Sequence, residues 1–177
     1  MHGVVFAALR DYSFEPLGRE RAEELCFDRT FSPTEVYDDE WFAAHLDRIA
    51  AAKAEPRDAV ARDFGVHAAR TTFVDLYPDY YATASDVFDF LLGLEEQIHE
   101  SVRAELPGAQ PPRLSVQRLD EGVQISYESE RRLCSVLEGL VHGVAAKLGP
   151  AVDTDETECM LRGGSRCVFT VVASDRG

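Results

Sequence analysis

Apolar residues recur every three or four positions through the first part of the chain, which is the spacing of amphipathic helices. The clearest case is 39–53, where Phe42, Leu46 and Ile49 would share one helical face. A strongly apolar helical segment, 85–106, is followed by a proline–glycine pair that ends a helix. The pattern predicts helices over residues 3–12, 19–27, 39–53, 56–67 and 85–106.

Beyond residue 112 the pattern changes to the alternation of apolar and polar side chains that is typical of strands. The turn sequence Asp120-Glu121-Gly122 separates the first two of these segments and predicts a hairpin. A second hairpin is predicted near the end of the chain. The pattern predicts strands over residues 114–119, 123–127, 157–161 and 167–172, with a helix over 131–148 between the two hairpins.

A helical first part followed by a mixed second part predicts an α+β fold. We expect a single domain over residues 1–177, because this length is sufficient for one sizeable core. Its N-terminal helical lobe would span about residues 1–60. Its C-terminal lobe, about residues 61–177, would consist of helices packed on a small antiparallel sheet.

The chain is acidic, with 32 Asp and Glu residues against 18 Lys and Arg and a net charge of −14. Nucleic acids and anionic membrane surfaces would repel such a chain, so neither is an expected partner. No apolar run approaches the ~18 residues that a membrane span requires. The N-terminus also lacks a basic segment followed by a sustained apolar stretch, so we expect a cytoplasmic protein.

Two features of the second part indicate a binding site for haem. His99 lies on an apolar flank of the helix predicted over 85–106, and Tyr127-x-Ser129-x-Arg131 lies where a strand is predicted. Residues two apart on a strand share a face, so the phenol, the hydroxyl and the guanidinium would point the same way. Together they offer donors for a pair of carboxylates. The imidazole of His99 would ligate the haem iron. The clamp, made of Tyr127, Ser129 and Arg131, would bind the haem propionates.

Six stretches of the chain occur in the order and at the spacing of one family of sensor domains. They are MHGVV at 1–5, TFVDLYPDYY at 72–81, EQIH at 96–99, PPRL at 111–114, YESER at 127–131 and LEGLVHG at 137–143. On these stretches, which are spread over nearly all of the chain, the protein resembles the bacterial stand-alone members of the haem–nitric oxide/oxygen-binding (H-NOX) family.

The resemblance implies haem b between the two lobes, with His99 as the iron ligand. Tyr127, Ser129 and Arg131 match the propionate-binding residues of the family one for one. Pro112 matches a proline that presses on the porphyrin and distorts it, a role that suits a rigid ring with a fixed φ.

The residues by themselves leave alternatives open. Ser129 would also be suited to capping the helix that follows, and Arg113 and Arg132 are further cations for the same anionic groups. The remaining histidines have no setting comparable with that of His99. We expect them to be structural or solvent-facing; they are His2, His45, His67 and His142.

The resemblance also bears on which gas would bind. Val136 stands where oxygen-binding members carry a distal tyrosine, whose hydroxyl donates a hydrogen bond to oxygen, and valine has no donor. NO and CO bind ferrous haem without such help. We therefore expect a sensor that binds NO, and also CO, and excludes oxygen. The other pocket positions that the resemblance implies are all apolar; they are Val5, Leu9, Ala69, Phe73 and Leu140.

Three of the four cysteines form a second group of candidate ligands. Cys134 would lie on the helix after the clamp, and Cys159 and Cys167 on the last hairpin. A subset of H-NOX proteins uses cysteines at this spacing, together with a histidine, as a structural zinc site. Glu156 stands at the position of that histidine, and zinc accepts a carboxylate oxygen. The alternatives are His142 or water as the fourth ligand, or three buried thiols without zinc.

The resemblance further implies how a signal would leave the domain. NO would weaken the iron–His99 bond, the porphyrin would flatten against Pro112, and one lobe would rotate relative to the other. The chain ends after the last predicted strand, without a kinase, cyclase or transporter module. We therefore expect a separate protein partner, a histidine kinase or a diguanylate cyclase.

Two other classes of function are weighed against this one. The first is a haem-free zinc-thiolate redox sensor or binding module built on Cys134, Cys159 and Cys167. The second is an enzyme, which we do not expect. The sequence shows no nucleophile–base pair, and an apolar distal pocket lacks the acid–base pair that peroxidase chemistry needs.

Overall fold

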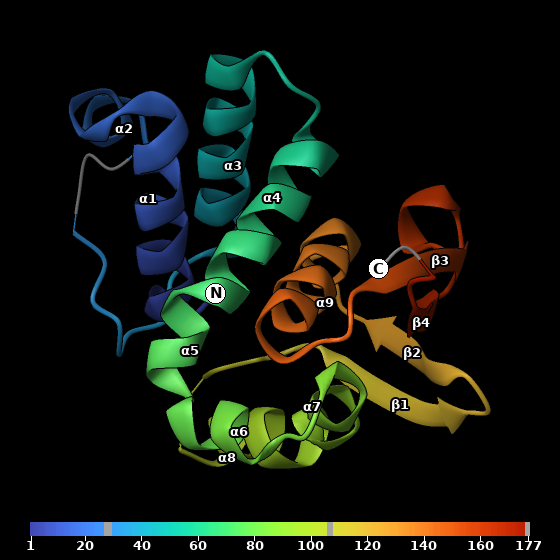
Figure 1. Cartoon of the computed structure of the whole chain (residues 1–177). Helices are drawn as coiled ribbons and strands as arrows, with labels where there is room; N and C mark the ends of the chain where they lie inside the picture. The colour runs from blue at the N-terminus through green and yellow to red at the C-terminus, as the bar shows by residue number, and fades with distance from the viewer. Residues whose placement is uncertain (27–29, 106–107, 176–177) are drawn as a thin grey trace.

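The first part of the chain is helical, as the apolar pattern predicts. The structure, a computed structural model, describes residues 1–26, 30–105 and 108–175. Figure 1 shows the first four helices gathered on one side of the molecule. The first helix runs past the predicted end at residue 12, because buried positions such as Tyr12 and Ser13 continue its inner face. The bounds are α1 (Gly3–Leu17), α2 (Arg19–Cys26), α3 (Asp39–Lys53) and α4 (Arg57–Arg70).

Helix α4 packs closely against α9 (Cys134–Leu148), which lies between α4 and the sheet (Figure 1). Glycines allow this approach. A Cβ atom on Gly65 would lie 2.3 Å from the carbonyl oxygen of Val136, and one on Gly139 would lie 2.0 Å from that of Arg62. Both separations are well inside van der Waals contact, so any larger residue would push the two helices apart.

The segment predicted as one helix over 85–106 is interrupted by a π-helical turn. The N–H of Glu100 donates to the carbonyl of Glu95, five residues back, as in a π-helix. Such turns are rare and occur frequently at functional sites. Leu106, the predicted end of this helix, lies outside the described residues. Two short helices that the pattern does not predict, α5 and α6, come before this segment. The bounds are α5 (Thr72–Leu76), α6 (Pro78–Thr83), α7 (Val87–Leu94), η1 (Glu95–His99) and α8 (Glu100–Glu105).

Four strands form one antiparallel sheet in the order β1-β2-β4-β3. The first hairpin forms as predicted, but the strand predicted at 157–161 is displaced toward the N-terminus, and a 3-10 turn, η2 (Met160–Arg162), follows it. This strand lies at the edge of the sheet, and its sequence VDTDETE is polar because only Val152 is buried. The bounds are β1 (Arg113–Leu119), β2 (Gly122–Glu128), β3 (Val152–Glu158) and β4 (Cys167–Ala173).

Buried side chains form two clusters. One surrounds Phe6, Phe42 and Phe64 among the N-terminal helices, and the other joins the later helices to the sheet through residues such as Phe90 and Ile125. The fold is therefore α+β, as predicted, with a helical N-terminal lobe and a C-terminal lobe of helices on a small antiparallel sheet. Among the described residues, no helix is both long enough and apolar enough to cross a membrane.

Candidate functional site

A cavity of about 250 Å³ lies between the two clusters of buried side chains. Its wall is mainly apolar and takes residues from helices of both lobes and from β1 and β2. None of the described residues that line it is an aspartate or a glutamate. Its polar side chains are His2, Tyr77, Tyr81, His99, Gln110, Tyr127, Ser129 and Arg131. Such a wall suits a large apolar ligand that carries a metal and a few anionic groups.

His99 lies on the π-helical turn η1 and lines this cavity. Its Nδ1 lies 3.0 Å from Oε2 of Glu95. Because a carboxylate accepts, Nδ1 is the donor and Nε2 is the nitrogen left to bind a metal. Burial lowers the pKa of His99, and the hydrogen bond to Glu95 only partly offsets this effect. The imidazole is therefore neutral at pH 7, the form that ligates iron.

Glu95 is a part of the site that the sequence analysis missed. Its Oε2 also accepts a hydrogen bond from the backbone N–H of Leu114 at 3.2 Å, and its Oε1 pairs with the guanidinium of Arg103. Partial burial favours the neutral carboxyl, but these partners outweigh it and hold the pKa of Glu95 below its usual value. The sequence signal that could have identified Glu95 is its four-residue spacing from His99, which puts both residues on one helical face.

The three clamp side chains all line the cavity, but they do not all come from a single strand. Strand β2 ends one residue after Tyr127, so Ser129 and Arg131 lie in the loop before α9. The expectation that strand alternation aligns all three is therefore wrong. The loop is instead fixed by backbone contacts, among them the N–H of Leu133, which donates to the Tyr127 hydroxyl at 3.2 Å. Ser129 does not cap α9, which has no side-chain cap.

Arg131 also connects the two lobes. Its Nε lies 2.8 Å from one carboxylate oxygen of Asp39, at the start of α3, and the other oxygen pairs with the amino group of Met1. Partial burial raises the pKa of Asp39, but the two cations outweigh this and hold it below its usual value. The alternative cations, Arg113 and Arg132, are exposed and do not line the cavity.

Most of the predicted apolar pocket residues line the cavity. Two of them, Leu9 and Ala69, do not; neither has any exposed surface, and each packs into one of the two clusters of buried side chains. Leu9 lies one helical turn beyond Val5, deeper in the N-terminal lobe. The carbonyl of Ala69 accepts a hydrogen bond from the Tyr81 hydroxyl at 2.8 Å. The predicted residues that do line the cavity are Val5, Phe73, Pro112, Val136 and Leu140.

His2, expected to be structural or solvent-facing, lines the cavity instead. Both of its ring nitrogens are buried, and neither has a hydrogen-bond partner within the described part of the chain. Burial and the neighbouring amino terminus lower its pKa. No periodic pattern covers this position, because His2 comes before α1, where it forms an isolated bridge with Val36.

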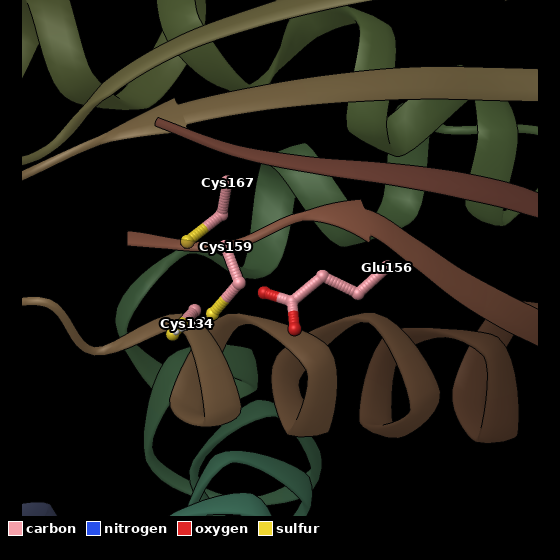
Figure 2. Close-up of side chains that lie close together, drawn as sticks. All are labelled: Cys134, Glu156, Cys159 and Cys167. Carbon is pink, nitrogen blue, oxygen red and sulfur yellow. Dashed lines mark hydrogen bonds between the residues drawn. The ribbon is translucent and has the colours of Figure 1, made fainter. Parts of the chain in front are cut away.

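The predicted group of metal ligands is also brought together (Figure 2). Cys134, at the start of α9, meets Glu156, Cys159 and Cys167 from the last two strands and their connection, with all four ligand atoms within 4.8 Å of one another. The Sγ atoms of Cys134 and Cys159 are 3.8 Å apart. Two sulfurs bound to a tetrahedral zinc at ~2.3 Å would be separated by about the same distance.

The acid in this cluster has an oxygen available for a metal. Oε1 of Glu156 is buried without a hydrogen-bond partner among the residues described, while Oε2 lies 3.0 Å from Nη2 of Arg162. Burial raises the pKa of the thiols of Cys134 and Cys167, the latter to about 11. His142, the alternative ligand, lies outside the cluster, with Nε2 3.3 Å from the Thr154 hydroxyl. The geometry therefore favours Glu156 over His142.

Comparison with known proteins identifies the family. The family model described as Haem-NO-binding (HNOB) matches residues 2–154. Among curated proteins, none matches the chain at a significant level. An H-NOX protein from S. oneidensis, in its Fe(II)NO state, superposes with a TM-score of 0.92 at 22% identity, covering 99% of this chain and 100% of that chain. A mutant of the T. tengcongensis H-NOX protein gives 0.87 at 21% identity, with 99% and 98% covered.

A third structure, a mutant of the H-NOX protein from K. algicida in its unliganded Fe(II) state, gives a TM-score of 0.86 at 19% identity, covering 99% of this chain and 98% of that chain. At these identities the solved structures show a shared fold. The family model, in contrast, matches most of the chain. This chain therefore belongs to the haem–NO-binding (H-NOX) family.

Proposed function

We propose that this chain is a haem-based gas sensor that binds NO at ferrous haem b. The observation that supports this most directly is that one apolar cavity brings together His99 and the clamp side chains Tyr127, Ser129 and Arg131, which come from separate segments. Nε2 of His99 would ligate the iron, and the clamp would bind the propionates. Haem, when bound, would supply the iron site for a diatomic gas.

We propose that the apolar wall selects the gas. Val136 and its neighbours on α9 and α5, Leu140 and Phe73, offer no hydrogen-bond donor, so a bound oxygen would gain no hydrogen bond from them, whereas NO and CO bind without one. Solved structures of the S. oneidensis relative in Fe(II)NO and Fe(II)CO states support NO and CO as ligands of this fold.

Substitution of Val136 by tyrosine tests the selection of gas. We expect Val136→Tyr to gain oxygen affinity of roughly tenfold or more, because a hydrogen bond to a charged group stabilises by about 1.5–3 kcal/mol. Val136→Phe adds a similar ring without the donor and should gain none. Absorption spectra of the reduced proteins under air provide the measurement. A stable oxygen-bound spectrum in the unmodified protein would show that the wall does not exclude oxygen.

We propose that a separate protein receives the signal, a histidine kinase or a diguanylate cyclase as family membership implies. Two features support transmission between the lobes. Pro112 is on the cavity wall, and the Arg131–Asp39 ion pair joins the clamp to α3. A change in the propionate contacts of Arg131 would alter that ion pair. Partner affinity then changes through contacts that differ between the two lobe arrangements.

The proposed role is binding and signalling, without catalysis. A cytoplasmic location is proposed as well, because Cys134, Cys159 and Cys167 lie together as candidate metal ligands, and cysteines in a reducing compartment are more often thiols or metal ligands than disulfides.

We propose further that the cluster of Cys134, Glu156, Cys159 and Cys167 holds a structural zinc ion. The support is the spacing of the four ligand atoms and the unpartnered Oε1 of Glu156. This site would tie the start of α9 to the β3–β4 hairpin. It would accompany the haem site, and neither the family match nor the fold supports the haem-free redox module considered above.

Metal analysis tests the zinc site. We expect about one zinc per chain whatever the haem loading, since tetrahedral structural sites bind one ion. Cys159→Ser should lose most of the metal and destabilise the last hairpin, because metal binding is coupled to folding. Glu156→Gln should weaken the site, whereas Asp155→Asn, which removes an exposed acid on the same strand, should not. A haem-containing protein with three freely titrating thiols and no zinc would contradict this proposal.

A further inference from the structure

We propose that Glu95 sets the strength of His99 as a ligand of haem iron, and thereby how readily His99 would leave the iron of bound haem when NO is added. This inference rests on the proposed haem site. It assigns Glu95 as a positioning residue that acts through His99.

The geometry of Glu95 is unusually well determined by its partners. Oε2 lies 3.0 Å from Nδ1 of His99 and 3.2 Å from the backbone nitrogen of Leu114 on β1, while Oε1 pairs with the Arg103 guanidinium. Donors from the π-helical turn, from α8 and from the sheet therefore hold both oxygens. The carboxylate cannot rotate away from His99 without breaking at least one other contact.

Such a carboxylate changes the chemistry of the imidazole. An acceptor at Nδ1 pulls the proton toward itself, raises the electron density on Nε2 and makes it a stronger metal ligand. Arg103 acts in the opposite direction, because its charge withdraws negative charge from the same carboxylate. The strength of His99 as a ligand would therefore be set by the balance between Glu95 and Arg103.

An ordinary surface ion pair at four-residue spacing contributes little interaction energy, because water screens both charges. Two observations separate Glu95 from that case. The side chains of His99 and Glu95 are only 14% and 25% exposed, so water competes weakly for their hydrogen bond. The N–H of Leu114 binds the same oxygen and joins it to the strand that follows Pro112. The adjacent Glu96 is exposed and serves as a matched control.

The test uses the full chain with haem bound and reduced. The iron–histidine stretching band in the resonance Raman spectrum reports the strength of the bond directly, and a merely structural role would not shift it. We expect Glu95→Gln to lower this frequency, because a neutral amide is a weaker acceptor, and to raise the fraction of five-coordinate spectrum after NO. Arg103→Gln should shift the frequency the other way. Glu96→Gln should match the unmodified protein.

Loss of a supporting partner typically costs roughly 10- to 100-fold in metal–ligand affinity, so the NO result should be visible in absorption spectra. A frequency in Glu95→Gln equal to that in Glu96→Gln would overturn the inference. If the unmodified protein shows no histidine-ligated ferrous haem at all, the proposed function has failed. An unshifted band in a clearly histidine-ligated protein refutes only the role of Glu95.

Discussion

His99→Ala should abolish the histidine-ligated spectrum of the reduced, haem-bound protein, and added imidazole should restore it. His99 lines the cavity with its Nε2 left over for a metal, so its removal leaves a space that a free imidazole can fill. Some haem should stay bound through the clamp and the apolar wall, which makes the spectrum measurable. Absorption spectroscopy with and without imidazole provides the test.

The matched control is His2→Ala, because His2 is the other histidine among the described residues that line the cavity. We expect this variant to keep the histidine-ligated spectrum. If His99→Ala showed the spectrum of the unmodified protein without imidazole, another residue would be the ligand. If His99→Ala kept the histidine-ligated spectrum and His2→Ala lost it, the ligand would be His2.

Arg131→Ala should weaken haem binding by roughly tenfold to 150-fold, because a hydrogen bond to a charged group stabilises by about 1.5–3 kcal/mol. Arg131 is only 16% exposed and lies on the cavity wall, so solvent competes weakly with it as a partner for a propionate. The rate of haem transfer from the protein to an excess of an apoglobin acceptor measures the effect.

Arg113→Ala and Arg132→Ala remove exposed cations on either side of the clamp and should leave the transfer rate nearly unchanged. Equal rates for all three variants would show that the clamp does not hold the propionates. Asp39→Asn adds a second control. It removes the ion-pair partner of Arg131 without touching the cavity wall, so the effect on haem loss should be smaller than that of Arg131→Ala.

The helices other than α5 and α6, and the first hairpin, could be predicted because their apolar residues recur at a regular spacing. Strand β3 was displaced in the prediction, since as an edge strand it buries only Val152 and shows no alternation. The π-helical turn at Glu95–His99 was missed for a different reason. A π-helical turn differs from an α-helix in bonding five residues back instead of four, and no residue type marks that change.

The composition of the site could be predicted more fully than its geometry. Motif spacing identified His99 and the clamp, but the loop after β2, and not strand alternation, brings Ser129 and Arg131 to the cavity. His2 and Glu95 were missed because their roles depend on contacts between distant segments. His2 lines the cavity and its backbone pairs with Val36, and Glu95 is held in part by the N–H of Leu114.

The absorption spectrum of the purified protein, reduced without oxygen and recorded before and after NO, tests the proposed haem site most directly. We predict the Soret band of a five-coordinate, histidine-ligated ferrous haem, a clear shift of that band on addition of NO, and under air only slow oxidation. Absence of a Soret band after reconstitution with haem, or a band that does not respond to NO, would contradict the proposal that this cavity is a haem-based sensor of NO.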